Sequence, residues 1–132
     1  VKFAAVGFCF GGWVTGRFLA LQNQPSITCA VGVHPSWQPE PIGGDGSPLE
    51  LAERVGTKPI LFLPAGNDDL KPNNPVVQQL AEQRSVDPEE VSVPFEDMKH
   101  GWVARNDPND DESVAREQAH ALELVANFIK KH

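Results

Sequence analysis

The stretch Gly7-Phe8-Cys9-Phe10-Gly11-Gly12 joins a strand pattern to a helix pattern, and this junction indicates the fold class of the chain. Residues 3–6 before it are a continuous apolar run, which is typical of a strand buried on both faces of a sheet. After it, residues 11–22 place apolar side chains at the spacing of one helix face. The junction itself has the G-x-C-x-G spacing of a nucleophile elbow, with cysteine in place of serine.

An elbow of this kind holds its nucleophile on a sharp, strained turn at the top of a sheet, and flanking glycines let neighbouring backbones approach. The helix behind Cys9 would present free N–H groups and the positive end of its dipole, which favour a thiolate and an oxyanion. We therefore expect Cys9 to be a nucleophile and the Phe10 N–H to donate to the oxyanion. Two alternatives stay open: a small buried packing cysteine, and a dinucleotide-binding loop, which would need glycine at position 9.

Outside the elbow, short apolar runs alternate with helix patterns along the whole chain. Three further apolar runs cover residues 27–33, 60–63 and 91–95, and the helix patterns that follow them begin near residues 47, 74 and 112. This βαβαβαβα order predicts an α/β fold, a parallel sheet flanked by helices on both faces. Pro94 cannot donate a ladder hydrogen bond, so the fourth strand is expected at or near a sheet edge.

Two of the predicted helix starts carry recognisable capping residues. Ser47, followed by Pro48 and by Glu50, predicts an N-cap with a capping box. Asn74 before Pro75 predicts a second capped start of the same type. These local signals support the division of the chain into alternating strands and helices.

Length, composition and charge limit the classes of protein to which the chain can belong. Its 132 residues predict one domain over residues 1–132, and 40% hydrophobic with 22% charged residues is a globular composition. The net charge of −7 argues against binding nucleic acid or an anionic membrane surface, and no apolar run is long enough to span a membrane.

The cysteine and histidine spacings limit the class further. Two cysteines, Cys9 and Cys29, are too few for a disulfide scaffold and are expected as free thiols, which favours a cytoplasmic protein. No pair of histidine or acidic residues shows metal-ligand spacing, so the sequence predicts no metal and no cofactor.

Polar residues suited to catalysis follow the ends of the predicted strands. Cys9, His34, Asp68 and His100 each come after such a strand, where ligands bind in open α/β sheets. An elbow nucleophile needs a base, and the base needs an acid to orient it. In the elbow fold these groups occur in the order nucleophile, acid, histidine, which Cys9, Asp68 and His100 follow. The alternatives are a surface histidine and an aspartate that only caps its loop.

The elbow, the Asp68 loop that ends in Pro72, and the sequence His100-Gly101-Trp102 resemble the dienelactone hydrolase family of the α/β-hydrolase superfamily. The resemblance covers essentially all 132 residues. It implies a Cys-His-Asp triad that hydrolyses a small ester or lactone through a thioester, with Cys9, His100 and Asp68 as its members. Family members place a proline four residues after the acid, which favours Asp68 over Asp69.

Members of this family are considerably longer, and the resemblance implies that the chain corresponds to their C-terminal half. On this resemblance we expect an α/β-hydrolase-like sheet without its N-terminal strands and without the loop that supplies a second oxyanion N–H. We expect an upstream segment or another chain along residues 2–7, where the first strand would otherwise be an exposed edge. The alternative to an enzyme is a truncated, non-catalytic domain that acts as a subunit or interaction module.

Four further residues are candidates for substrate contacts. Arg105 could anchor a substrate carboxylate, and His34 is expected near the rim of the site. Trp37 and Trp102 could wall a hydrophobic pocket. Each has a structural alternative: core packing for the tryptophans, a satisfied structural role for the histidine, and a solvated loop position for the arginine.

Overall fold

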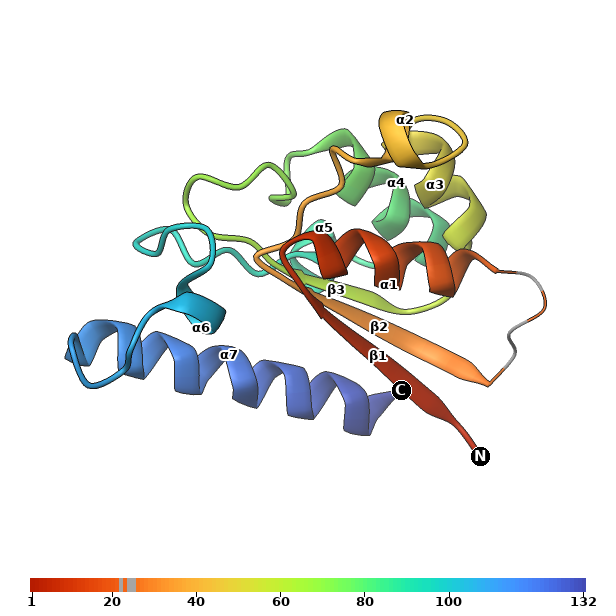
Figure 1. Ribbon diagram of the computed structural model, residues 1–132. Coiled ribbons are helices and arrows are strands. Elements are labelled where there is room, and N and C mark those ends of the chain that lie inside the picture. Colours follow the sequence, from red (N-terminus) through yellow and green to blue (C-terminus); the bar gives the residue numbers. More distant parts are fainter. Residues whose placement is uncertain (22, 24–25) are drawn as a thin grey trace.

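The computed structural model describes residues 1–21, 23 and 26–132 of the chain. Its sheet has three parallel strands in the order β1-β2-β3, with bounds β1 (Phe3–Phe8), β2 (Ile27–Val33) and β3 (Ile60–Leu63). Helices connect each strand to the next and cover both faces of the sheet (Figure 1). The predicted α/β class, a parallel sheet flanked by helices, is confirmed.

The helices divide between the two faces. Helices α1 (Phe10–Ala20), α3 (Pro48–Val55) and α4 (Pro75–Arg84) cover one face, and the long α7 (Glu112–Lys131) covers the other (Figure 1). Single-turn helices lie in the connections: α2 (Glu40–Gly43), α5 (Pro88–Val91) and α6 (Trp102–Arg105). Among the described residues, none of these helices has the length and hydropathy needed to cross a membrane.

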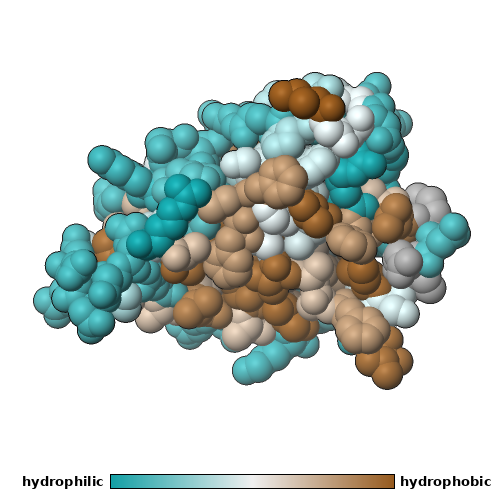
Figure 2. Space-filling model, viewed as in Figure 1, coloured by the Kyte–Doolittle hydropathy of each residue, from teal (hydrophilic) through white to brown (hydrophobic). Residues whose placement is uncertain are grey.

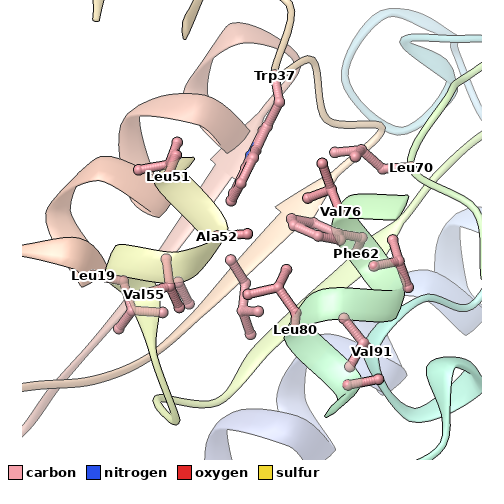
Figure 3. Packing of buried hydrophobic residues seen from close by; sticks show 14 of the residues in the cluster. Leu19, Trp37, Leu51, Ala52, Val55, Phe62, Leu70, Val76, Leu80 and Val91 are labelled. Carbon is pink, nitrogen blue, oxygen red and sulfur yellow. The ribbon is translucent and has the colours of Figure 1, made fainter. Parts of the chain in front are cut away.

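The core consists of two clusters, because alternate residues of β2 and β3 point to opposite faces of the sheet. The first cluster joins Ala30, Ile60 and Phe62 to α1, α3 and α4. Figure 3 shows Trp37 and Phe62 in this cluster among the side chains of α3 and α4. The second cluster joins the other strand residues to α6 and α7, and its members in β2 and β3 are Val31, Val33, Leu61 and Leu63. Burial on both faces explains why continuous apolar runs encode these two strands.

The predicted helix starts are present. The Ser47 side chain accepts from the Glu50 N–H, and the Glu50 carboxylate accepts from the Ser47 N–H at 2.7 Å, which completes the capping box of α3. Asn74 caps α4 by accepting from the Val76 N–H at 2.8 Å. Local hydrogen bonding within a few residues is enough to specify both starts.

The prediction of a fourth strand over residues 91–95 is wrong. The segment makes only two isolated bridges: Phe62 with Ser92, and Ala65 with Phe95. Pro88 begins the helical turn of α5, which takes Val91 out of the extended conformation. Pro94 has no N–H to donate to a ladder. The segment therefore runs beside β3 without forming a strand of its own.

Strand β1 does not show the burial on both faces that its apolar run predicts. Among the described residues it pairs with β2 alone, at one edge of the sheet. Its residues Phe3, Val6 and Phe8 are 57%, 38% and 39% exposed. Figure 2 shows apolar side chains gathered over this part of the molecule. An apolar run implies burial on both faces only where neighbouring elements cover both, and β1 is an exposed apolar edge.

Candidate active site

Cys9 lies at the sharp turn between β1 and α1, as the elbow pattern predicts. Its backbone has φ 53° and ψ −120°, a conformation that costs a non-glycine residue on the order of 1–3 kcal/mol. The turn is tight, because a Cβ at Gly7 would collide with the carbonyl oxygen of Gly11. On the other side, a Cβ at Gly12 would lie 2.6 Å from Cβ of Pro35. Close packing around Cys9 therefore requires glycine at positions 7 and 12, whereas a Cβ at Gly11 would meet open space.

Asp68 and His100 form a hydrogen-bonded pair at the same end of the sheet. His100 Nδ1 and Asp68 Oδ1 lie 2.6 Å apart, and the two side chains are 25% and 7% exposed, respectively. The second carboxylate oxygen, Asp68 Oδ2, accepts from the Ala65 N–H at 2.8 Å. A carboxylate held in this way fixes the orientation of the imidazole and places the proton of the neutral ring on Nδ1.

The backbone around the pair is also fixed. The N–H of His100 donates to Asn67 Oδ1 at 2.8 Å, so the loops that carry the two partners are joined directly. Asp69, the alternative acid, accepts instead from Gln38 Nε2 at 2.8 Å. The fold therefore pairs His100 with Asp68, the acid that the family spacing favours.

The sulfur of Cys9 has two polar neighbours. His34 Nδ1 lies 3.2 Å from Cys9 Sγ, and Arg105 Nη2 donates to the sulfur at 3.6 Å. Cys9 Sγ and one ring nitrogen each from His34 and His100 lie within 4.8 Å of one another. The thiol thus contacts His34 directly, and a ring nitrogen of His100 lies within 4.8 Å of it.

His34 is fully buried, in contrast to the rim position expected from the sequence. Its backbone has φ 38°, and its ring packs edge-on against the rings of His100 and Trp102 at centroid distances of 5.3 Å each. Burial, with a smaller contribution from the charge of His100, lowers the pKa of His34 to about 4, so this ring is neutral near pH 7. The buried His34 side chain is therefore not exposed to a substrate in the groove, but it contacts the sulfur of Cys9.

Sequence reasoning missed the contact between His34 and Cys9, although a signal for it exists. Val33 at the end of β2 pairs in register with Phe8 at the end of β1. The residues that follow these strands, His34 and Cys9, must therefore be neighbours. The two side chains are 25 residues apart in the sequence, so the contact can be found only when the order of the strands in the sheet is known.

A groove of about 600 Å³ opens beside Cys9. Its lining is mainly apolar and consists of Cys9, Phe10, Trp13, Ser36, Gln38, Pro39, Ile42, Gly43 and His100. Phe10 is the first residue of α1, which places its N–H at the N-terminus of that helix. The phenyl ring packs edge-on against Trp13 at a centroid distance of 5.0 Å. A small, largely apolar molecule would fit between these rings and the segment around α2.

Trp37 and Trp102 are not among the residues that line this groove. Trp37 is 2% exposed, donates from Nε1 to the Gly12 carbonyl at 3.1 Å, and packs edge-on against Phe62. Trp102 is 1% exposed and packs on Phe95 at a centroid distance of 4.9 Å. Both rings are core residues, because burial of a large aromatic surface outweighs the gain from leaving it at a pocket wall. The substrate-contact expectation for the two tryptophans is therefore corrected to core packing.

Glu40 is a buried acid that no pattern in the sequence indicates. Its side chain is fully buried and accepts from Trp13 Nε1 at 2.5 Å, from Arg17 at 2.9 Å and from Arg54 at 2.9 Å. Burial alone would raise the pKa of Glu40, but hydrogen bonds from Trp13 and Arg17 outweigh burial and hold its pKa below the ordinary value. Asp45 pairs with the same two arginines. This network fixes α2, and with it one wall of the groove.

Comparison with known proteins agrees with the resemblance seen in the sequence. The model of the dienelactone hydrolase family matches residues 1–132, the whole chain. No curated protein matches the chain. A match over the full length, on a fold with the elbow and the parallel sheet described above, shows that the chain belongs to the dienelactone hydrolase family.

Proposed function

We propose that this protein is a hydrolase that cleaves a small ester or lactone through a thioester on Cys9. One observation carries the proposal: Cys9, on a strained elbow, shares the end of the sheet with a hydrogen-bonded Asp68–His100 pair and opens onto a groove. Membership of a hydrolase family supports the reaction class. The roles assigned to the individual residues rest on their geometry.

In the proposed first step, His100 accepts the thiol proton of Cys9 at Nε2, while Asp68 keeps Nδ1 protonated. The thiolate attacks the acyl carbonyl carbon, and the Phe10 N–H donates to the oxyanion that forms. When the intermediate collapses, the carbon–oxygen bond of the ester breaks and His100 returns its proton to the leaving alkoxide. The acyl group is then held as a thioester on Cys9.

In the second step, water replaces the alcohol. His100 takes a proton from water, hydroxide attacks the thioester, and the Cys9 thiolate leaves and is reprotonated. In the free protein the sulfur is hydrogen-bonded to His34 Nδ1, so it must turn toward His100 before the first step. Its nearest ring nitrogen on His100 is at most 4.8 Å away, and catalytic hydrogen bonds are often long until substrate binds.

The surroundings of the sulfur favour a particular kind of substrate. The groove lining is mainly apolar, which suits a short acyl chain or a small ring. Arg105 is exposed, and its guanidinium donates to the sulfur at 3.6 Å. We propose that this guanidinium holds a carboxylate on the substrate and places the neighbouring carbonyl next to Cys9.

The proposal is tested by turnover of p-nitrophenyl acetate and of a small lactone. The Cys9→Ala variant should lose hydrolysis to the background rate, because it removes the attacking atom. Cys29→Ala is the matched control, since Cys29 is fully buried in β2 away from the groove, and should keep turnover. An unchanged kcat/KM in Cys9→Ala would refute the thioester mechanism.

A second candidate function, an interaction module, is favoured by the exposed apolar edge of β1. A strand from an upstream segment or another chain could pair with the free backbone edge along residues 2–7, and its side chains would cover part of the exposed Phe3 and Val6. Size-exclusion chromatography, thermal unfolding and the ester assay on the 132-residue chain separate the two functions. A soluble monomer that unfolds cooperatively and hydrolyses esters would contradict the module.

A further inference from the structure

Three potential metal-binding side chains meet at the carboxyl end of the sheet. Cys9 Sγ and ring nitrogens of His34 and His100 lie within 4.8 Å of one another. They come from three separate loops, 25 and 66 residues apart, so no short-range spacing in the sequence reveals them. A thiolate with two imidazoles is a ligand set that binds Zn²⁺ with a fourth position left open.

The surroundings of the two histidines suit metal ligation. His34 is fully buried, and its Nδ1 points at Cys9 Sγ, which presents this nitrogen to a cation held by the sulfur. Its Nε2 has no hydrogen-bond partner in the described residues, so His34 lacks the outer support that most ligating histidines have. The ring of His100 has its Nδ1 on Asp68, which leaves Nε2 as a ligand atom. A carboxylate behind a ligating histidine is the usual outer support of a zinc site.

We propose that Cys9, His34 and His100 form a binding site for a thiophilic divalent cation, with Zn²⁺ as the natural candidate, and that the bound cation blocks hydrolysis. The groove supplies the open side, where water would take the fourth position. On binding, the Cys9 thiol loses its proton to solvent and the sulfur becomes a ligand. Metal binding stands on the cluster alone, and only the inhibition rests on the proposed hydrolase function.

Two features of the structure set the affinity. Donor atoms in a tetrahedral zinc site lie about 3.3–3.6 Å apart, so the His100 ring must move toward the sulfur, which a side chain 25% exposed permits. Arg105 opposes the cation, because its guanidinium lies 3.6 Å from the same sulfur. Removing this charge should tighten metal binding severalfold, an effect that an adventitious surface site would not show.

The test is a Co²⁺ titration of the metal-free 132-residue chain, followed by displacement with Zn²⁺. We expect one Co²⁺ per chain, with the charge-transfer absorption of a cobalt thiolate and the intense visible bands of tetrahedral geometry. Cys9→Ser should abolish the charge-transfer band, and His34→Gln and His100→Gln should each weaken binding at least about tenfold. Arg105→Ala should strengthen it. His120→Gln, at an exposed histidine outside the cluster, is the matched control and should bind as wild type.

Circular dichroism checks the fold of each variant. If the buried His34 does not tolerate replacement, the two single variants Cys9→Ser and His100→Gln are enough to test the metal site. A cobalt spectrum without thiolate absorption, or equal binding by wild type and Cys9→Ser, would overturn the metal site. Hydrolysis that Zn²⁺ does not inhibit at saturating occupancy would overturn the inhibitory role. Metal binding by a chain that hydrolyses nothing would confirm the site and refute the hydrolase instead.

Discussion

Glu40 and Asp68 are both buried carboxylates near the groove, but their partners differ in kind. Glu40 is bound by two arginines and a tryptophan, whose N–H groups stay protonated at any pH that the fold survives. Asp68 is bound by one histidine and one backbone N–H. The histidine can gain and release a proton, and its free edge faces the groove.

The difference shows what each carboxylate is placed to do. Permanent cations around Glu40 make a fixed ionic network that holds α2 against α1 and α3. A titratable partner for Asp68 makes a pair whose protonation can change during a reaction. We therefore expect substitutions at Glu40 to change stability more than turnover, and substitutions at Asp68 to change turnover more than stability.

The largest expected effect is that of Asp68→Asn on turnover. The amide can no longer fix the tautomer of His100 or stabilise the imidazolium, and kcat/KM should fall by about 10³- to 10⁴-fold. The measurement is ester hydrolysis under saturating and limiting substrate. Asp69→Asn is the matched control, because Asp69 binds Gln38 and not His100, and should keep near wild-type turnover. Equal losses in the two variants would remove the assigned role of Asp68.

A smaller effect is expected from Glu40→Gln on stability. The change leaves Arg17 and Arg54 facing a neutral amide, and the free energy of unfolding should fall by about 2–3 kcal/mol. This value is below that of a fully buried pair because both arginines are partly exposed. Urea unfolding measures it, and Asp45→Asn on the exposed side of the network should cost less. A stable Glu40→Gln variant that has lost turnover would reverse the comparison.

The smallest effect is the acid dependence of the same network. The pKa of Glu40 is lower in the fold than its ordinary value of 4.5, so the stability it supplies is present above that value. It is lost as pH falls through the folded pKa. Unfolding curves from about pH 6 to about pH 3 should therefore show a shallower decline for Glu40→Gln than for wild type. Protonation of the buried His34 also lowers stability in acid, but this loss is the same in wild type and in Glu40→Gln and cancels in the comparison. Parallel declines would show that Glu40 does not titrate as described.

The parts of the fold that depend on local signals were predictable from the sequence. The elbow at Cys9 and the capped starts at Ser47 and Asn74 depend on residues within one turn of each other. The β2 and β3 runs were predicted because burial on both faces leaves a continuous apolar pattern. Predicting that Asp68 pairs with His100 required the proline spacing of the family in addition to the order of the residues along the chain.

The wrong fourth strand has a local origin, whereas the omissions at His34 and Glu40 arise from contacts between distant segments. Val91 belongs to a helical turn because Pro88 starts one just before it, and the apolar alternation after it suggested a strand. The burial of His34 under Cys9 depends on the register of β1 with β2. Glu40 meets Arg17 and Arg54 across 23 and 14 residues, and no pattern in the sequence connects them.

Trapping the acyl intermediate tests the central claim most directly. The chain is mixed rapidly with p-nitrophenyl acetate, quenched in acid within the first turnovers, digested and analysed by mass spectrometry. We predict an acetyl group on the peptide that contains Cys9, at a level that decays as substrate is exhausted, and none on that peptide in Cys9→Ala. Wild-type turnover without an acyl group on Cys9, persisting in the Cys9→Ala variant, would contradict a thioester mechanism.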